Sequence, residues 1–212
     1  LVTAGPTQEQ LDPVRYFTNR SSGKMGYAIA EVAAKYGADV TLISGPTHLE
    51  APVGVTRVSV ASALDMYHEV LNRYQETDVV VKAAAVADYR PEKTSTNKIK
   101  KSHEDFTVRF VRNPDILKTL GEQKHHQILI GFAAETEKID DYAMKKLKDK
   151  HLDMIVANDV GRSDAGFAVD TNQVTFFYHD GGKRALNLMS KQKVAYAICD
   201  EIATLLKSRE GK

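Results

Sequence analysis

The chain has little of several residue types, and each shortage excludes a class of protein. Cys199 is its single cysteine, so no disulfide framework holds the fold together. No apolar run approaches the ~20 residues of a membrane span, and no segment has the basic start and apolar centre of a signal peptide. With 29 basic and 28 acidic side chains, the net charge of +1 creates no bulk attraction to nucleic acid or membranes. These shortages favour a protein of the reducing cytoplasm.

The remaining composition is that of a globular protein. Apolar residues make up 42% of the chain and charged residues 27%, and 212 residues fit one domain with a substantial core. We therefore expect a single domain over residues 1–212. The chain starts at Leu1, inside an expected strand and without a methionine, so we expect it to be a piece of a longer polypeptide.

Apolar runs alternate with helical patterns along most of the chain, which is typical of a parallel sheet with helices on both faces. The expected strands are Leu1–Ala4, Asp39–Ser44, Thr56–Val60, Val79–Ala84, Gln127–Gly131 and Met154–Ala157. The expected helices are Lys24–Tyr36, Ser62–Tyr74, Asp115–Gln123, Ile139–Lys150 and Ser190–Lys207. The predicted fold class is α/β, a Rossmann-like open and mostly parallel sheet with an added antiparallel hairpin.

Two segments interrupt this alternation. Residues 91–105 are polar and rich in lysine with few apolar anchors, which predicts a mobile loop or flap. Residues 166–188 contain an alternating apolar pattern at Val174, Phe176 and Tyr178, followed by the turn signal Asp180-Gly181-Gly182. This pattern predicts an antiparallel hairpin, whose aromatic run is either local core or the seam of a dimer.

The first strand and helix resemble a dinucleotide-binding unit but depart from it in two ways. The tight glycine turn is replaced by a long insert, QEQLDPVRYFTNRSS, which separates Gly5 from the helix start. The second strand ends in Ser44 and Gly45, where a dehydrogenase normally carries an acid for the cofactor ribose. Both departures count against an NAD-dependent dehydrogenase.

Several expected strands end in small residues followed by polar ones. Ser21 to Gly26 open a helix, where unpaired amides suit an anion such as a phosphate. Alanines precede Asp88, Phe132 follows a glycine, and Asn158 follows a buried strand. Each cluster alone has a bland explanation in helix capping or packing. Their convergence on the carboxyl ends of parallel strands favours a nucleotide-sized cleft.

No metal or nucleophile motif is present in the sequence. His125 and His126 are the only close histidine pair, no His and Cys set has zinc-ligand spacing, and no serine lies in a nucleophile elbow. The residues that do suggest a function are five lysines, Lys98, Lys100, Lys101, Lys146 and Lys150. Such lysines usually form a solvated face, but a lysine on a loop over a triphosphate would neutralise charge developing at phosphorus.

Six motifs occur in one order, GPTQEQLDPVRYFTNRSSGKMG, AAAVADYRP, KIKK, NPDI, GFAAET and AND. With them the chain resembles the bacterial phosphopantothenoylcysteine synthetase (phosphopantothenate-cysteine ligase) family over essentially its whole length. The resemblance implies that CTP activates 4'-phosphopantothenate to an acyl-cytidylate with release of pyrophosphate. The amine of L-cysteine then displaces CMP. It also implies Mg2+ on the triphosphate, a homodimer, and fusion to a flavin-dependent decarboxylase in many bacteria.

The resemblance also implies roles for individual residues. Asn19 and Lys98 match catalytic positions, with Lys98 on a flap, and Arg15, Asn19, Ala84 and Ala85 match substrate-binding positions. The matching nucleotide-binding positions are Gly23, Lys82, Ala83, Ala84, Asp88, Lys98, Pro114, Asp115, Ile116, Leu117, Phe132, Lys146 and Lys150. Arg15 is expected near a dimer interface, where it serves its own site or that of the neighbouring subunit. The magnesium ligands are not assigned.

Two other functions are compatible with the same fold. One is an ATP-dependent version of the ligase, because the choice of base depends on a few backbone contacts that a sequence does not show. The other is a nucleotide-binding module without catalysis. Asn19 and Lys98 favour a catalyst, because a protein that only binds nucleotide needs neither residue.

Overall fold

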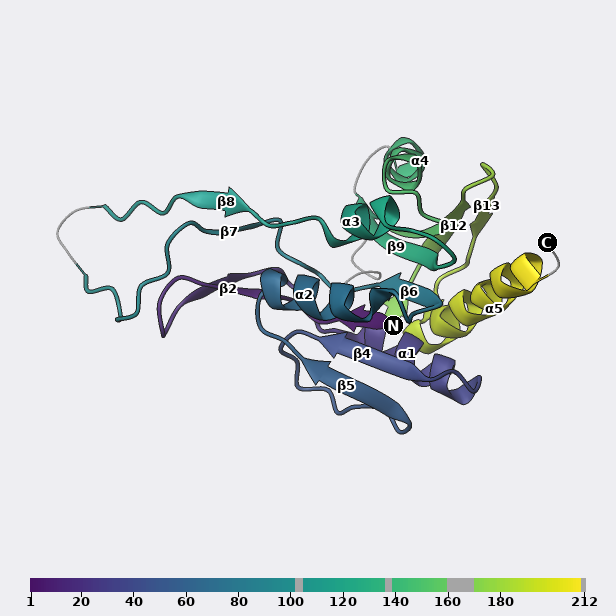
Figure 1. The fold of residues 1–212 in the computed structure, drawn as a ribbon, viewed down its shortest axis with the longest axis horizontal. Helices are drawn as coiled ribbons and strands as arrows, with labels where there is room; N and C mark the ends of the chain where they lie inside the picture. The colour runs from purple at the N-terminus through teal and green to yellow at the C-terminus, as the bar shows by residue number, and fades with distance from the viewer. Residues whose placement is uncertain (102–104, 136–138, 160–169, 211–212) are drawn as a thin grey trace.

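A computed structural model describes residues 1–101, 105–135, 139–159 and 170–210 (Figure 1). It contains an eight-stranded sheet in the order β13-β12-β10-β9-β6-β1-β4-β5. The parallel strands are β1 (Val2–Ala4), β4 (Val40–Ser44), β5 (Val55–Ser59), β6 (Val79–Lys82), β9 (Ile128–Glu135) and β10 (Met154–Asp159). The antiparallel additions are β12 (Val174–Tyr178) and β13 (Lys183–Ala185). The predicted fold class is confirmed.

Helices cover both faces of the sheet. One face carries α1 (Lys24–Lys35) and α5 (Lys191–Glu210), and the other carries α2 (Ala63–Tyr74), α3 (Ile116–Glu122) and α4 (Ile139–Asp149). Figure 1 shows the two groups of helices on opposite sides of the strands. Among the described residues, no helix is long and apolar enough to cross a membrane.

Consecutive residues of the strands supply the two faces with separate cores. On β4, Leu42 packs with the cluster under α1 and α5, whereas Ile43 packs with the cluster under α2, α3 and α4. On β9, Ile130 and Leu129 divide between the same two clusters. Successive strand side chains point to opposite faces, so continuous apolar runs are what a sheet buried on both sides requires.

Some strand boundaries differ from those expected. The strand β9 continues four residues past Gly131, because Phe132 and the alanines after it pair with Val156 to Asn158 of β10. The alanines at this end have a low strand propensity, so the sequence did not predict that the strand continues. The strand β6 stops at Lys82, two residues before the expected end at Ala84, because the chain leaves the sheet there.

The long insert after β1 is not a plain loop. It forms an antiparallel ribbon of β2 (Gln8–Gln10) and β3 (Tyr16–Thr18), and a second ribbon pairs β7 (Tyr89–Pro91) with β8 (Phe110–Arg112). Together these ribbons build an arm, residues 7–18, 88–101 and 105–113, that extends away from the sheet (Figure 1). Phe17 and Phe110 connect the ribbons by an edge-to-face contact with ring centroids 4.6 Å apart.

The expected flap, residues 91–105, is part of this arm. Pro91 ends β7, residues 92–101 have no helix or strand, and residues 102–104 lie outside the described part of the chain. The Ser95 amide donates to the Leu11 carbonyl at 2.9 Å, so this segment lies against the insert. Its predicted mobility stays a prediction.

The predicted hairpin is present, but its aromatic run is core. The Tyr178 amide donates to the Gly182 carbonyl at 2.9 Å across the turn. Phe176 and Phe177 are 0% and 2% exposed, because β12 lies between β10 and β13 and is not an edge. The edge strand is β13, and its three residues are exposed. Exposed aromatic surface therefore gives no support for a dimer seam here, and residues 166–169 of the expected hairpin lie outside the described part.

Candidate active site

A cleft lies beyond the carboxyl ends of β1, β6, β9 and β10, where a parallel sheet places its ligands. It consists of two adjoining hollows of about 530 Å³ and about 550 Å³ that share Lys82, Val86 and Asp88 in their walls. The volume is in the range of cavities that hold small molecules. The cleft therefore has room for a nucleotide-sized ligand together with a second substrate.

The amino end of α1 forms one wall of the first hollow. Gly23 precedes the helix with φ of 77°, a left-handed conformation, and it supplies no side-chain cap to the first turn. A Cβ at Gly26 would lie 2.6 Å from the Cβ of Ala4, so only glycine lets α1 pack this closely on β1. The helix thus presents its amide end to the cleft, which favours an anionic group.

The floor of the cleft is the backbone that follows β6. Two buried hydroxyls fix it, because the Ala84 amide donates to Thr3 Oγ1 at 3.2 Å and the Ala87 amide donates to Thr7 Oγ1 at 3.0 Å. Asn19 lies over this floor and its Nδ2 donates to the Val86 carbonyl at 3.1 Å. Because this partner is an acceptor, the amide nitrogen faces the floor.

A cationic cluster lines the second hollow. Lys150 Nζ lies 2.7 Å from Asp115 Oδ2, and Asp115 also caps α3 by accepting from the Lys118 amide at 3.1 Å. Burial lowers the pKa of Lys82 to about 8, and the charge of Lys150 acts in the same direction. Burial alone would raise the pKa of Asp115, but the hydrogen bonds from Lys150 and the Lys118 amide lower it. An anion entering this hollow would offset the positive charge of Lys82 and Lys150.

The side of the cleft next to β10 adds Asn172 and Lys191, which the sequence did not single out. Asn172 Nδ2 donates to Asn158 Oδ1 at 3.1 Å, and both residues line the first hollow. Lys191 lines it as well, and Lys24 Nζ pairs with Asp170 Oδ1 at 2.6 Å. Asn172 lies in the two-residue strand β11 (Thr171–Asn172), which pairs with β14 (Met189–Ser190). Strands this short leave no periodicity for a sequence to display.

The structure brings most of the expected site residues together. The first hollow is lined by Asn19, Gly23, Lys82, Ala83, Ala84, Ala85, Asp88 and Phe132, and the second by Lys82, Asp88, Pro114, Asp115, Ile116 and Lys150. Lys146 lies one helical turn before Lys150, and its charge also lowers the pKa of Lys82. Leu117 is 5% exposed and packs in the core under α3.

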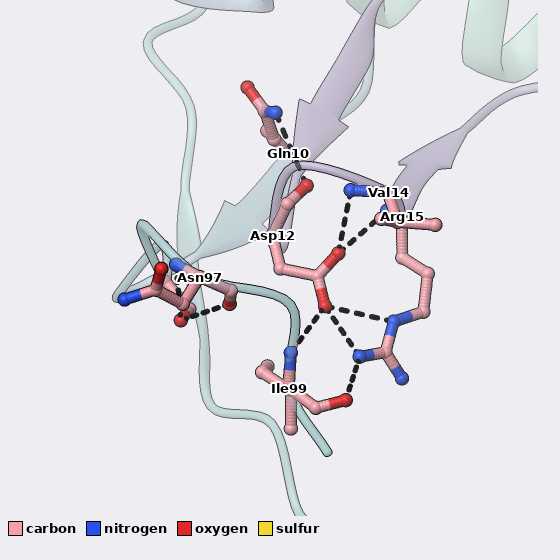
Figure 2. Close-up of polar contacts among 7 residues, drawn as sticks. Gln10, Asp12, Val14, Arg15, Asn97 and Ile99 are labelled. Carbon is pink, nitrogen blue, oxygen red and sulfur yellow. Dashed lines mark hydrogen bonds and ion pairs between the residues drawn. The ribbon is translucent and has the colours of Figure 1, made fainter.

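Four of the expected site residues line neither hollow, and they are Arg15, Lys98, Leu117 and Lys146. Arg15 and Lys98 lie on the arm. Arg15 is paired with Asp12, and its Nη2 donates to the Ile99 carbonyl at 2.8 Å (Figure 2). The structure of this chain alone therefore does not bring these two side chains to the cleft.

Within the described residues, no group of three or more His, Cys, Asp or Glu side chains gathers in a way that could hold a metal ion. The acidic residues in the cleft are Asp88, on the rim shared by both hollows, and Asp115, which is paired with Lys150. The chemical resources of the site are thus cationic side chains, amides, hydroxyls and two exposed carboxylates, of which Asp115 is paired with Lys150.

An open α/β sheet with a cleft at the carboxyl ends of its strands, and a helix amino end in the wall, is a class of fold in which phosphate-bearing ligands commonly bind at the strand ends. The comparison with known families gives a narrower result. Residues 1–206 match the family described as the DNA/pantothenate metabolism flavoprotein C-terminal domain, and the chain belongs to that family.

Curated relatives agree with this family. The chain is 54% identical over 208 residues to the coenzyme A biosynthesis bifunctional protein CoaBC of Bacillus subtilis (strain 168), covering 98% of the chain and 51% of the relative. It is 45% identical over 208 residues to CoaBC of Escherichia coli (strain K12), covering 96% of the chain and 51% of the relative. The chain thus spans about half the length of these relatives.

A solved structure extends the comparison. The crystal structure of the C-terminal domain of CoaBC is 51% identical, with a TM-score of 0.83 and coverage of 97% of this chain and 96% of that one. The structural similarity therefore covers nearly the whole length of both chains.

Proposed function

We propose that the chain is a phosphopantothenate-cysteine ligase domain of coenzyme A biosynthesis. One observation carries this proposal, the cleft between the amide end of α1 and the lysines around Lys82. Two anionic substrates must meet in such an enzyme, and the cleft offers positive potential on both sides. The family and the coenzyme A biosynthesis proteins among the relatives support the same function.

The proposed reaction has two steps. A carboxylate oxygen of 4'-phosphopantothenate attacks the α-phosphorus of CTP, the bond to the bridging oxygen breaks, and pyrophosphate leaves. The amine of cysteine then attacks the acyl carbon, CMP leaves, and the amine proton is lost to solvent. Lys82 and Lys150 line the cleft and would neutralise the charge on the phosphates, which is the main catalytic need of nucleotidyl transfer.

We propose that Asn19 acts on the activated acyl group. Its nitrogen is held by the Val86 carbonyl, so the side chain is oriented before a substrate arrives. A side chain fixed in this way positions a reactive group without losing rotamer entropy at the moment of reaction. We place the nucleotide across Lys82 toward Pro114 and Ile116, with Phe132 at the border between the substrates.

Magnesium is the cation that this chemistry calls for, and the residues present fit it. Mg2+ keeps several waters and binds proteins through one or two carboxylates together with substrate phosphates. A built cage of acidic residues is therefore not required, and exposed Asp88 on the shared rim is the carboxylate that would hold the ion. When bound, Mg2+ would neutralise negative charge on the phosphates of the nucleotide.

A second copy of the chain is the proposed source of the residues missing from the cleft. The arm exposes several large apolar side chains, which are Val14, Tyr16, Phe17, Tyr89, Phe106 and Phe110. Contiguous apolar exposure of this kind is typical of an interaction surface. We propose that the arm docks on a partner subunit and that Arg15, Lys98 or both then reach the partner's cleft. In this proposal the arm, and not the hairpin expected at residues 166–188, forms the dimer interface.

The test is a reconstituted reaction. The protein is incubated with 4'-phosphopantothenate, cysteine, CTP and magnesium, and CMP, pyrophosphate and the amide product are quantified by chromatography and mass spectrometry. We expect all three products in equal amounts, and Lys98→Gln should lower turnover by on the order of 10². Lys93→Gln on the same arm is the matched control.

The same assay separates the alternatives. Faster product formation with ATP than with CTP would identify the ATP-dependent ligase. Saturable nucleotide binding without any CMP or AMP, in the presence of both other substrates, would leave the non-catalytic module as the function and overturn the ligase.

A further inference from the structure

The carboxylate of Asp12 is completely buried although it lies in the polar insert, and it is saturated with hydrogen-bond donors. Asp12 is 0% exposed. Its Oδ1 accepts from the Val14 and Arg15 amides at 2.8 Å each, which closes the turn between β2 and β3. Its Oδ2 accepts from Arg15 Nε at 3.0 Å, from Arg15 Nη2, and from the Ile99 amide at 3.1 Å (Figure 2). Each oxygen therefore has a separate task.

The second oxygen holds a segment that is distant in sequence. The Ile99 amide bonds Asp12 across 87 positions of the chain, and the Ile99 carbonyl accepts from Arg15 Nη2 at 2.8 Å. Both main-chain polar groups of Ile99 are thus held by one ion pair. Ile99 directly follows Lys98, so the Asp12–Arg15 pair fixes the backbone on which the flap lysine is carried.

We propose that Asp12 is a positioning residue that holds Lys98 in its working geometry by clamping the backbone of Ile99 with the Asp12–Arg15 ion pair. This inference rests on the proposed function for the role of Lys98. It deepens that function, because it makes the insert the support of the flap as well as the carrier of Arg15.

Electrostatics and burial agree with a built clamp. Hydrogen bonds from Arg15 hold the pKa of Asp12 well below its usual range, although burial alone would raise it. The carboxylate therefore stays charged at neutral pH. Hydrogen bonds to a charged, buried acceptor are among the stronger ones in proteins. Two additional bonds join the same surfaces, from Thr94 Oγ1 to the Gln10 carbonyl at 3.1 Å and from the Ser95 amide to the Leu11 carbonyl at 2.9 Å.

Asp12→Asn is the variant that separates the two tasks. Asparagine also supports a turn of this kind, so Oδ1 can keep the Val14 and Arg15 amides. The amide nitrogen then replaces Oδ2 and meets two donors, the Ile99 amide and the Arg15 guanidinium. The variant should fold but release Ile99. Glu92→Gln is the matched control, because it removes the 3.4 Å pair with Arg109 elsewhere on the arm.

The first measurement is independent of activity. Limited trypsin digestion followed by mass spectrometry reports cleavage between Lys98 and Ile99, with the Lys93–Thr94 bond as an internal reference. In Asp12→Asn we expect cleavage after Lys98 to rise by on the order of tenfold, the scale for one lost hydrogen bond, with cleavage after Lys93 unchanged. Equal cleavage after Lys98 in Asp12→Asn, Glu92→Gln and the unaltered chain would overturn the clamp.

The second measurement is a double-mutant cycle on turnover. Asp12→Asn should lower kcat by on the order of tenfold, and the loss should disappear in a Lys98→Gln background, because no lysine is then left to position. Additive losses would mean that Asp12 acts through the substrate-binding role of Arg15 or through general stability, and not through Lys98, and would overturn the proposal. If Lys98→Gln alone has no effect while the trypsin result holds, the clamp stands and the assigned role of Lys98 fails.

A third measurement keeps the clamp testable if Asp12→Asn does not fold. Amide hydrogen exchange by NMR on the unaltered protein should show the Ile99 amide exchanging more slowly than the Lys98 and Lys100 amides beside it. Equal exchange of the three amides would show that Ile99 is not held and would overturn the proposal.

Discussion

Lys82 combines partial burial with two neighbouring lysines, and this combination sets how it responds to a ligand. Its pKa of about 8 means that it is mostly charged at pH 7 and mostly neutral at pH 9. The causes are burial first and the charge of Lys150 second. A phosphate placed beside it would favour the charged form and raise the pKa.

This linkage predicts proton uptake when a nucleotide binds. At pH 8.5 the free protein has lost most of the Lys82 proton, and the triphosphate should restore it, so affinity should fall by up to about tenfold per pH unit above 8. Calorimetry of CTP binding in two buffers of different ionisation enthalpy measures the uptake. It should vanish in Lys82→Met and persist in Lys145→Met, which changes an exposed lysine of α4. Heat that is independent of the buffer in the unaltered protein would contradict this prediction.

Asn19 allows a prediction about the reaction intermediate. In Asn19→Asp the amide donor to the Val86 carbonyl is lost and a negative charge is placed beside the acyl group. We expect acyl-cytidylate to form and to accumulate, because its conversion by cysteine is impaired. Mass spectrometry of a quenched reaction detects it. A normal yield of amide with no trace of this species would contradict the role of Asn19.

At the level of elements, the closeness of α1 to β1 sets the shape of the first hollow. Gly26→Ala would place a methyl group 2.6 Å from the Cβ of Ala4 and 2.9 Å from the Thr3 carbonyl. We expect a loss of about 1–3 kcal/mol in the free energy of unfolding, larger than the gain in helix propensity. The melting temperature should then fall by several degrees.

The control for this prediction is Gly182→Ala in the turn between β12 and β13. A Cβ there would meet only the side chains of Asp180 and Tyr178, at 3.1 Å or more. Its melting temperature should change by less than that of Gly26→Ala. A Gly26→Ala protein as stable as the unaltered one, measured by calorimetry, would show that α1 can shift freely on the sheet.

The elements that a sequence can predict are those whose signals are local. The capping box of α2 is an example, because a serine three residues before an aspartate predicts it. The Ser62 amide donates to Asp65 Oδ2 at 2.8 Å, and the Asp65 amide donates to Ser62 Oγ at 3.1 Å. The arm could not be predicted in this way. Its strands have only three residues each. One donor to the Asp12 carboxylate, the Ile99 amide, lies 87 positions away, so the sequence of the insert does not show that Asp12 is buried.

The residues of the candidate site also divide into those with a signal in the sequence and those without one. Asp88, which follows β6, could be predicted because topology alone brings such residues to one edge of the sheet. Asn172 and Lys191 lie on and beside the short strand pair β11 and β14, which has no periodicity for a sequence to display. The lysine-rich segment singled out Lys98, and the resemblance to a known family supplied Lys82, Arg15 and the proposed role of Lys98.

The whole molecule carries its own prediction, because Arg15 and Lys98 lie on the arm and not in the cleft. If Arg15 serves the partner's site and Lys98 serves its own, mixing inactive Arg15→Ala with inactive Lys98→Gln should restore activity, since one of the two sites in a mixed dimer then receives both intact residues. Subunit exchange is followed with labelled chains and light scattering. No recovery despite complete exchange would show that Arg15 and Lys98 serve the same site.

The arm and the cleft floor leave the sheet side by side, from β1 and β6, and a bridge between Pro6 and Ala85 joins them at that point. A ligand on the floor would therefore lie next to the residues at which the arm begins. If the arm docks on a partner and the cleft binds a nucleotide, as proposed, the two equilibria are coupled reciprocally. Any factor by which the nucleotide strengthens subunit association is then the factor by which association strengthens nucleotide binding, so nucleotide affinity would depend on the concentration of the protein.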